Sequence, residues 1–125
     1  MPTPIELCAG GTAIPAVLND TVAARDFKRR LPVSVSVRRS AGDYCCTAAS
    51  GIFDPAETQS GWEAGDISLT GGWLELWLGG EGPAPCRSLM VIAHIDEAAL
   101  PLVRRLPDPA RLTIRLAETA DGKQG

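Results

Sequence analysis

Apolar and polar side chains alternate most regularly on either side of Gly71-Gly72, a dipeptide that suits a tight turn between two strands. The pattern predicts a β-hairpin within residues 61–80, with Thr70 opposite Trp73. One face of this hairpin is wholly aliphatic and is expected to face the core: Ile67, Leu69, Leu74, Leu76 and Leu78. A slip of one residue would place polar groups in the core, so the pattern specifies the pairing register.

The opposite face of the same hairpin holds the candidate site. Its side chains are Asp66, Ser68, Thr70, Trp73, Glu75 and Trp77. Two tryptophans beside a carboxylate are typical of a platform for a small ligand or a peptide. The same residues also fit a face that packs under a loop or a helix, because large aromatic side chains mostly serve packing. The sequence leaves both interpretations open.

The remaining periodicity predicts further strands and two helices. A second hairpin is expected over 3–18 around Gly10-Gly11, and strands are expected over 33–37, 44–47, 89–95 and near 112–116. A helix at about 20–31 is expected to begin at Asn19 or Asp20, and a second at about 97–106 is expected to begin at Asp96. Loops are expected in the rest of 40–61 and over 79–88.

The same helical and strand periodicities predict which side chains face the core. The expected core side chains of the first helix and the outer strands are Ala23, Phe27, Leu31, Val33, Val35, Val37, Leu112, Ile114 and Leu116. This order of elements predicts a mainly β fold, a closed or nearly closed antiparallel barrel with a helix plugging each end. With 125 residues, the chain fits one domain over 1–118 and a flexible polar tail over 119–125.

Composition removes several functional classes. The net charge of −3 argues against nucleic-acid binding, which favours a basic surface. The chain shows no signal peptide and no apolar run of membrane-spanning length, so a cytoplasmic protein without membrane contact is expected. The four cysteines, Cys8, Cys45, Cys46 and Cys86, are then expected to be reduced. Their spacing does not suit zinc, and no phosphate loop is present, so neither a metal nor a cofactor is expected.

Catalytic chemistry is weakly indicated. His94 is the sole histidine, and nucleophilic catalysis would need a Cys or Ser beside it. Asp66 and Glu75 share a strand face and would suit acid–base work, although such carboxylates are mostly solvated. Arg38 adjoins a strand face, where it would meet a carboxylate such as Glu75. The predicted ligand-binding residues are therefore Arg38, Asp66, Trp73, Glu75, Trp77 and His94, and no catalytic residue is assigned.

Several short stretches, in this order, resemble a known family. They are Leu18-Asn19-Asp20, Ala24-Arg25-Asp26-Phe27, Leu31-Pro32, Gly65-Asp66-Ile67, Gly72-Trp73-Leu74-Glu75-Leu76-Trp77 and Ile95-Asp96. Over roughly residues 5–117, the chain resembles small bacterial and archaeal proteins of cyclophilin-like fold and unassigned function. The resemblance implies a closed antiparallel eight-stranded barrel with a helix at each end. The chain departs from the family at His94, where a basic residue, often Arg, is common.

The resemblance does not extend to the isomerase activity of true cyclophilins. Their active face carries Phe-His-Arg, which this sequence lacks, and a shared barrel does not transfer a site. The leading hypothesis is a non-catalytic binding module for a small ligand or an extended peptide. The alternatives are a peptidyl-prolyl isomerase and an accessory subunit of an amide-processing enzyme. Association with a partner protein or a second copy stays open.

Overall fold

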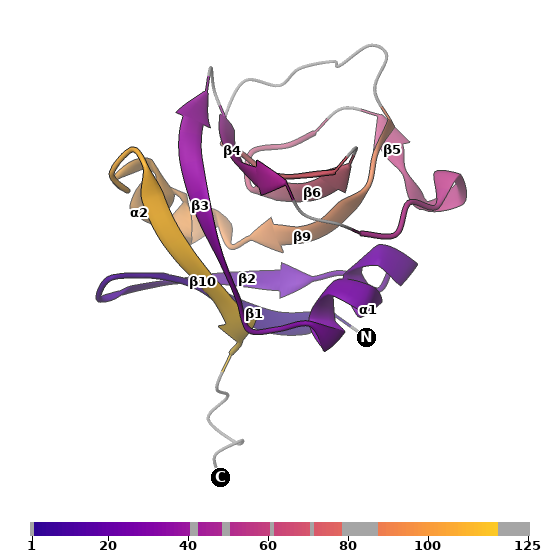
Figure 1. The fold of residues 1–125 in the computed structure, drawn as a ribbon, viewed down its shortest axis with the longest axis horizontal. Helices are drawn as coiled ribbons and strands as arrows, with labels where there is room; N and C mark the ends of the chain where they lie inside the picture. Colours follow the sequence, from indigo (N-terminus) through magenta and orange to yellow (C-terminus); the bar gives the residue numbers. More distant parts are fainter. Residues whose placement is uncertain are drawn as a thin grey trace, which may run out of the picture.

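The strands of this protein wrap into a barrel with a helix at either end (Figure 1). The structure is a computed structural model that describes residues 2–40, 43–48, 51–60, 62–70, 72–78 and 88–117, and at 40, 43–48, 60 and 88 it describes the backbone alone. The expectations for Gly71, the loop 79–87, Cys86, the tail 119–125 and the side chains of Cys45 and Cys46 lie outside the described residues.

Antiparallel pairing links all the longer strands. The strands are β1 (Thr3–Ala9), β2 (Thr12–Leu18), β3 (Val33–Ser40), β4 (Asp43–Ala48), β5 (Gln59–Ser60), β6 (Asp66–Thr70), β7 (Trp73–Trp77), β8 (Ser88–Leu89), β9 (Val91–Ile95) and β10 (Ala110–Leu116). Among the described residues the order β1-β10-β3-β4-β7-β6-β9-β2 closes on itself, and β5 pairs with β8 separately. The mainly antiparallel β architecture with two helices is thus confirmed.

Both predicted hairpins have the predicted register. In the first, Ile5 lies opposite Ala16 and Leu7 opposite Ile14. In the second, Leu69 lies opposite Leu74 and Ile67 opposite Leu76. Gly72 has a φ of 82°, the left-handed conformation that glycine adopts without strain. The aliphatic face of β6–β7 is buried in the barrel core, as the alternation predicts.

The first helix is shorter than predicted and begins elsewhere. α1 spans Val22–Arg29, and its N-cap is Thr21, whose hydroxyl accepts from the N–H of Ala24 at 3.1 Å. The prediction that Asn19 or Asp20 caps it was wrong because Asn19 has a different role. Its Oδ1 accepts from the N–H and hydroxyl of Thr21 at 3.1 and 2.7 Å, and its Nδ2 donates to the Val91 carbonyl at 2.7 Å.

The predicted helix over 97–106 is divided in two. A 3₁₀ turn spans Glu97–Ala99, and α2 spans Leu100–Arg104 with Pro101 in its first turn. Proline lacks an N–H, so it fits the start of a helix and interrupts its middle. Asp96 caps the 3₁₀ turn as expected, accepting from the Ala98 N–H at 3.3 Å. A further 3₁₀ turn, Pro55–Glu57, and strand β5 lie in the region expected to be loop.

One core cluster contains residues of the barrel and of both helices. Phe27 of α1 and Val103 of α2 are both buried in it. The two helices contribute these side chains from opposite ends of the barrel (Figure 1). Of the expected core residues, Val33, Val35 and Leu31 are partly buried against this cluster. Leu116 was assigned wrongly, since it is 46% exposed. It lies at the end of β10, where it still pairs with Ile5 of β1 but lies beyond the last residue that pairs with β3.

The predicted apolar strand 89–95 is interrupted at Met90, between β8 and β9. It is nevertheless covered on both faces, because its side chains from Leu89 to Ala93 are buried. No helix within the described ranges is long and apolar enough to cross a membrane.

Replacing Asn19 with Ala is expected to lower the free energy of unfolding by about 1–3 kcal/mol, the usual cost of leaving a buried polar group unsatisfied. The change removes the donor to the Val91 carbonyl and the acceptor that orients Thr21. Urea denaturation followed by circular dichroism measures the effect. Asn19→Asp keeps the acceptor for Thr21 but turns a carboxylate oxygen toward the Val91 carbonyl, so it is expected to destabilise the chain at least as much. An Asn19→Ala chain as stable as the native one would contradict the role given to this side chain.

Candidate functional site

Trp77 belongs to a second apolar cluster outside the barrel. It is 8% exposed, contacts Leu89 and Val91, and stacks on Trp62 with ring centroids 4.3 Å apart. Its indole Nε1–H donates to Oγ of Ser68 at 2.9 Å, and Ser68 itself is fully buried. The outer face of β6–β7 is therefore covered at this point, which matches the packing interpretation of Trp77.

The other strand-face candidates lie apart from this cluster. Trp73 is 50% exposed beside the β6–β7 turn, and Glu75 is half-buried in the middle of β7. Arg38 is exposed on β3. Arg38 and Glu75 both pair with Cys45 of β4, one from each side, so a strand separates them. Ligand binding by these three residues stays a prediction.

Two of the predicted residues, Asp66 and His94, are brought together. They face each other on paired strands β6 and β9, with Nδ1 of His94 2.8 Å from Oδ1 of Asp66. The second oxygen of Asp66, Oδ2, accepts from the N–H of Glu63 at 2.9 Å. Because an ionised carboxylate only accepts, the pair requires the proton on Nδ1 of His94, and in the neutral ring this leaves Nε2 as an acceptor.

Backbone geometry beside the pair holds the histidine ring in place. Gly65 has a φ of 103°, its N–H donates to the Trp77 carbonyl at 2.6 Å, and its carbonyl accepts from Ile95 at 2.7 Å. A Cβ at this position would lie 3.2 Å from Nε2 of His94, closer than most side-chain contacts. The glycine therefore lets the chain pass directly against the ring, and Asp66 fixes the ring from its other nitrogen.

His94 lines a cleft on the outer surface of β1 and β2, which we call the His94 cleft. The cleft has a volume of about 470 Å³. Register places its floor, since Val17 of β2 pairs with His94 on one side and with Pro4 of β1 on the other. Pro15 continues this apolar surface, and Val17 is 43% exposed. The side chains of this floor have few rotamers, so they lose little conformational entropy when an apolar ligand packs on them.

The polar side chains of the His94 cleft are all acceptors. Besides His94, they are the carboxylates of Glu6, Asp96 and Glu97. Glu6 is paired with Arg115 at 3.0 Å, and Asp96 caps the Ala98 N–H, so both are fixed. With Nε2 of His94 also accepting, the cleft is matched to a ligand that donates hydrogen bonds and carries positive charge.

The sequence indicated Asp66 and His94 but not the rest of the cleft. Val17 and Pro15 stand at positions of β2 whose alternation marks them as outward-facing, yet they are apolar, and this was the available signal. Within the described part of the chain, no group of three His, Cys, Asp or Glu side chains is arranged to hold a metal ion.

Comparison with known proteins agrees with the fold. A family model described as "Cyclophilin-like family" matches residues 7–115. No curated protein matches the chain. One similar solved structure is the solution structure of the hypothetical protein AF2241 from Archaeoglobus fulgidus, with a TM-score of 0.64, 14% identity, and coverage of 92% of this chain and 95% of that one.

A second similar structure is that of McbB in complex with tryptophan. Its TM-score is 0.65 at 10% identity, and the match covers 92% of this chain and 45% of that one. The chain thus spans less than half of McbB. At these identities, the two structures support the fold alone.

Proposed function

The chain belongs to the cyclophilin-like family, and from that premise we propose that it is a binding module that holds a small apolar molecule with a protonated amine in the His94 cleft. The observation that carries the proposal is the pairing of His94 with the buried Asp66 at the edge of this cleft. Asp66 occupies Nδ1, so Nε2 is the nitrogen left to accept from a ligand.

Charge supports a cationic ligand. The three carboxylates and the histidine acceptor surround an apolar floor, and only Glu6 among them has a cationic partner within the described residues. An ammonium group would replace lost water with charge-assisted hydrogen bonds, each contributing about 1.5–3 kcal/mol. An apolar body on Pro4 and Val17 would add burial.

The composition of the lining favours binding over nucleophilic catalysis. Among the described residues that line the His94 cleft there is no Ser, Thr or Cys to act as a nucleophile beside the histidine. The McbB structure adds that a protein sharing this fold over 45% of its chain has been solved in complex with tryptophan. We carry from it the ligand size, and take the amine preference from the His94 cleft itself.

Titration calorimetry of the full chain with tryptamine tests the proposal, with indole-3-propionate as the matched ligand that replaces the amine with a carboxylate. Tryptamine is expected to bind with one-to-one stoichiometry and indole-3-propionate at least about tenfold more weakly, because it brings a negative charge to carboxylates. Equal affinities, or a preference for the carboxylate, would contradict an amine site.

A pair of lysine variants locates the binding. Val17→Lys places an ammonium group on the floor of the His94 cleft and is expected to weaken tryptamine binding by about tenfold or more. Ala56→Lys adds the same charge on the exposed 3₁₀ turn Pro55–Glu57, outside the lining, and is expected to leave the affinity within about twofold. If both variants weaken binding equally, tryptamine binds elsewhere.

A further inference from the structure

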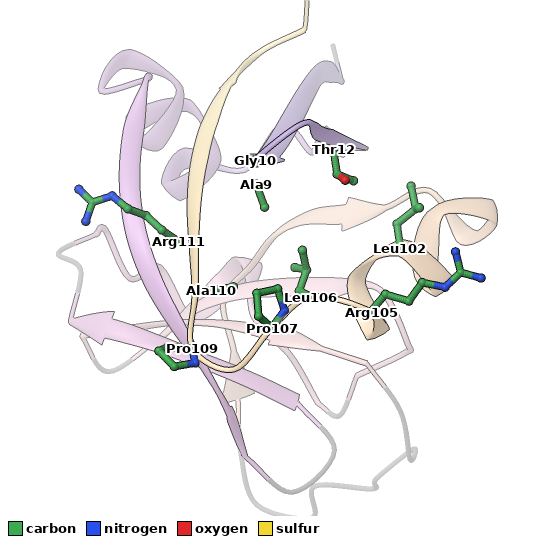
Figure 2. A pocket seen from close by; sticks show the side chains of 10 residues that line it. All are labelled: Ala9, Gly10, Thr12, Leu102, Arg105, Leu106, Pro107, Pro109, Ala110 and Arg111. Carbon is green, nitrogen blue, oxygen red and sulfur yellow. The ribbon is translucent and has the colours of Figure 1, made fainter.

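A second cleft lies at the α2 end of the barrel, between the tip of the β1–β2 hairpin and the segment that connects α2 to β10 (Figure 2). Its volume is about 500 Å³. We call it the arginine cleft, because its only charged lining residues in the described structure are Arg105 and Arg111. It shares no lining residue with the His94 cleft.

The centre of the arginine cleft is apolar and firmly held. Figure 2 shows Leu106 and Pro107 next to each other there, with Leu102 of α2 to one side and Ala9 and Thr12 of the hairpin above Leu106 and Pro107. Leu106 is buried and belongs to the barrel core. Arg39 of β3 fixes the connection by donating from Nη2 to the carbonyls of Arg104 and Leu106 at 3.0 and 3.4 Å. The apolar centre is therefore a preformed surface, held in place by the core and by the Arg39 hydrogen bonds.

The two arginines lie on opposite sides of this centre, and their guanidinium groups extend outward in the view of Figure 2. Both side chains are exposed, and neither guanidinium forms an ion pair or hydrogen bond with any residue that the structure describes. No carboxylate lines the arginine cleft. In a chain of net charge −3, these positive charges stand uncompensated on either side of an apolar surface.

We propose that the arginine cleft binds an extended acidic segment of a partner protein, with one bulky apolar side chain seated on Leu102, Leu106 and Pro107 and acidic residues on both sides of it. The opposite placement of the arginines favours a chain over a small anion. A single carboxylate reaches one guanidinium, whereas a peptide with acids before and after its apolar residue reaches both. Arginine presents paired donors that match a carboxylate.

Fluorescence anisotropy with an end-blocked, fluorescein-labelled Glu-Glu-Leu-Glu-Glu peptide tests this proposal on the full chain. The peptide is expected to bind, and Lys-Lys-Leu-Lys-Lys is expected to give no saturable binding. Glu-Glu-Gly-Glu-Glu is expected to bind at least about fivefold more weakly, since it keeps the charge and loses the apolar anchor. Equal affinity of the leucine and glycine peptides would overturn the proposal, because the apolar centre would then be unused.

Matched variants separate the arginine cleft from general charge attraction. The pair Arg105→Gln and Arg111→Gln, made together, is expected to weaken binding about tenfold or more. The pair Arg25→Gln and Lys28→Gln removes the same charge from the exposed face of α1 and is expected to change it less than about twofold. Equal weakening by the two pairs would overturn the site, as would displacement of the peptide by hexanoate at the peptide's own affinity.

A second copy of the chain is the other candidate occupant of the arginine cleft. Sedimentation of the chain alone tests whether it self-associates. A chain that stays monomeric at the concentrations used for anisotropy supports the partner peptide. A dimer that the double arginine variant dissociates would assign the arginine cleft to a second copy and overturn the proposal. Neither result bears on tryptamine binding, which uses the other cleft.

Discussion

Replacing Asp66 with Asn is expected to weaken tryptamine binding about 10–100-fold, although only one non-hydrogen atom of the side chain changes. The N–H of Glu63 donates to Oδ2, so the amide oxygen of Asn must take that position. Its NH₂ group then faces Nδ1 of His94, which has to accept. The ring proton moves to Nε2, and the ligand meets a donor where it requires an acceptor.

Calorimetry of the Asp66→Asn variant measures this loss, and Glu63→Gln is the matched control. Glu63 lies three residues away and contacts Asp66 through its backbone N–H, so its variant removes a charge without touching the pair. It is expected to keep the affinity within about threefold. An Asp66→Asn protein that is folded and binds tryptamine normally would show that His94 does not accept from the ligand.

Replacing Trp77 with Ala is expected to lower the free energy of unfolding by about 3–5 kcal/mol, the usual cost of truncating a buried aromatic side chain. The change removes the stacking on Trp62 and the contacts with Leu89 and Val91. It also leaves the hydroxyl of Ser68 buried without the indole donor. Urea denaturation monitored by far-ultraviolet circular dichroism gives the value without depending on tryptophan fluorescence.

Trp73→Ala is the internal control, since the two tryptophans share a strand and a face. Trp73 is half exposed, so its loss is expected to cost about 1 kcal/mol or less. Equal costs for the two variants would contradict the packing role of Trp77. The comparison also answers the question that the alternation of this strand left open, namely whether its tryptophans form one platform.

Elements fixed by local pattern were predictable. The register of β6–β7 follows from a strict period of two and a glycine turn, and both are local properties of the sequence. The first and last residues of the helices were harder to predict, because they depend on contacts with residues far away in the sequence. Asn19 is unavailable as a cap because its side chain is bound to β9, more than seventy residues away along the chain.

The candidate site shows the same division. Asp66 and His94 were each named, but their contact depends on the pairing of β6 with β9, which no local pattern specifies. The covering of Trp77 depends on Trp62, which precedes the paired residues of the predicted hairpin and whose position no alternation specifies. The apolar floor of the His94 cleft needs β1, β2 and β9 in adjacent places, and only the closed strand order provides that.

The central claim is that Asp66 holds His94 with its proton on Nδ1 and its Nε2 free to accept from an amine. Nitrogen NMR of the chain labelled with ¹⁵N-histidine tests it directly, since the sequence contains a single histidine. At a pH where the ring is neutral, we expect a protonated Nδ1 and an unprotonated Nε2. Tryptamine is expected to shift the Nε2 resonance and leave Nδ1 protonated. A proton on Nε2, or an Nε2 resonance that saturating tryptamine leaves unchanged, would contradict the account.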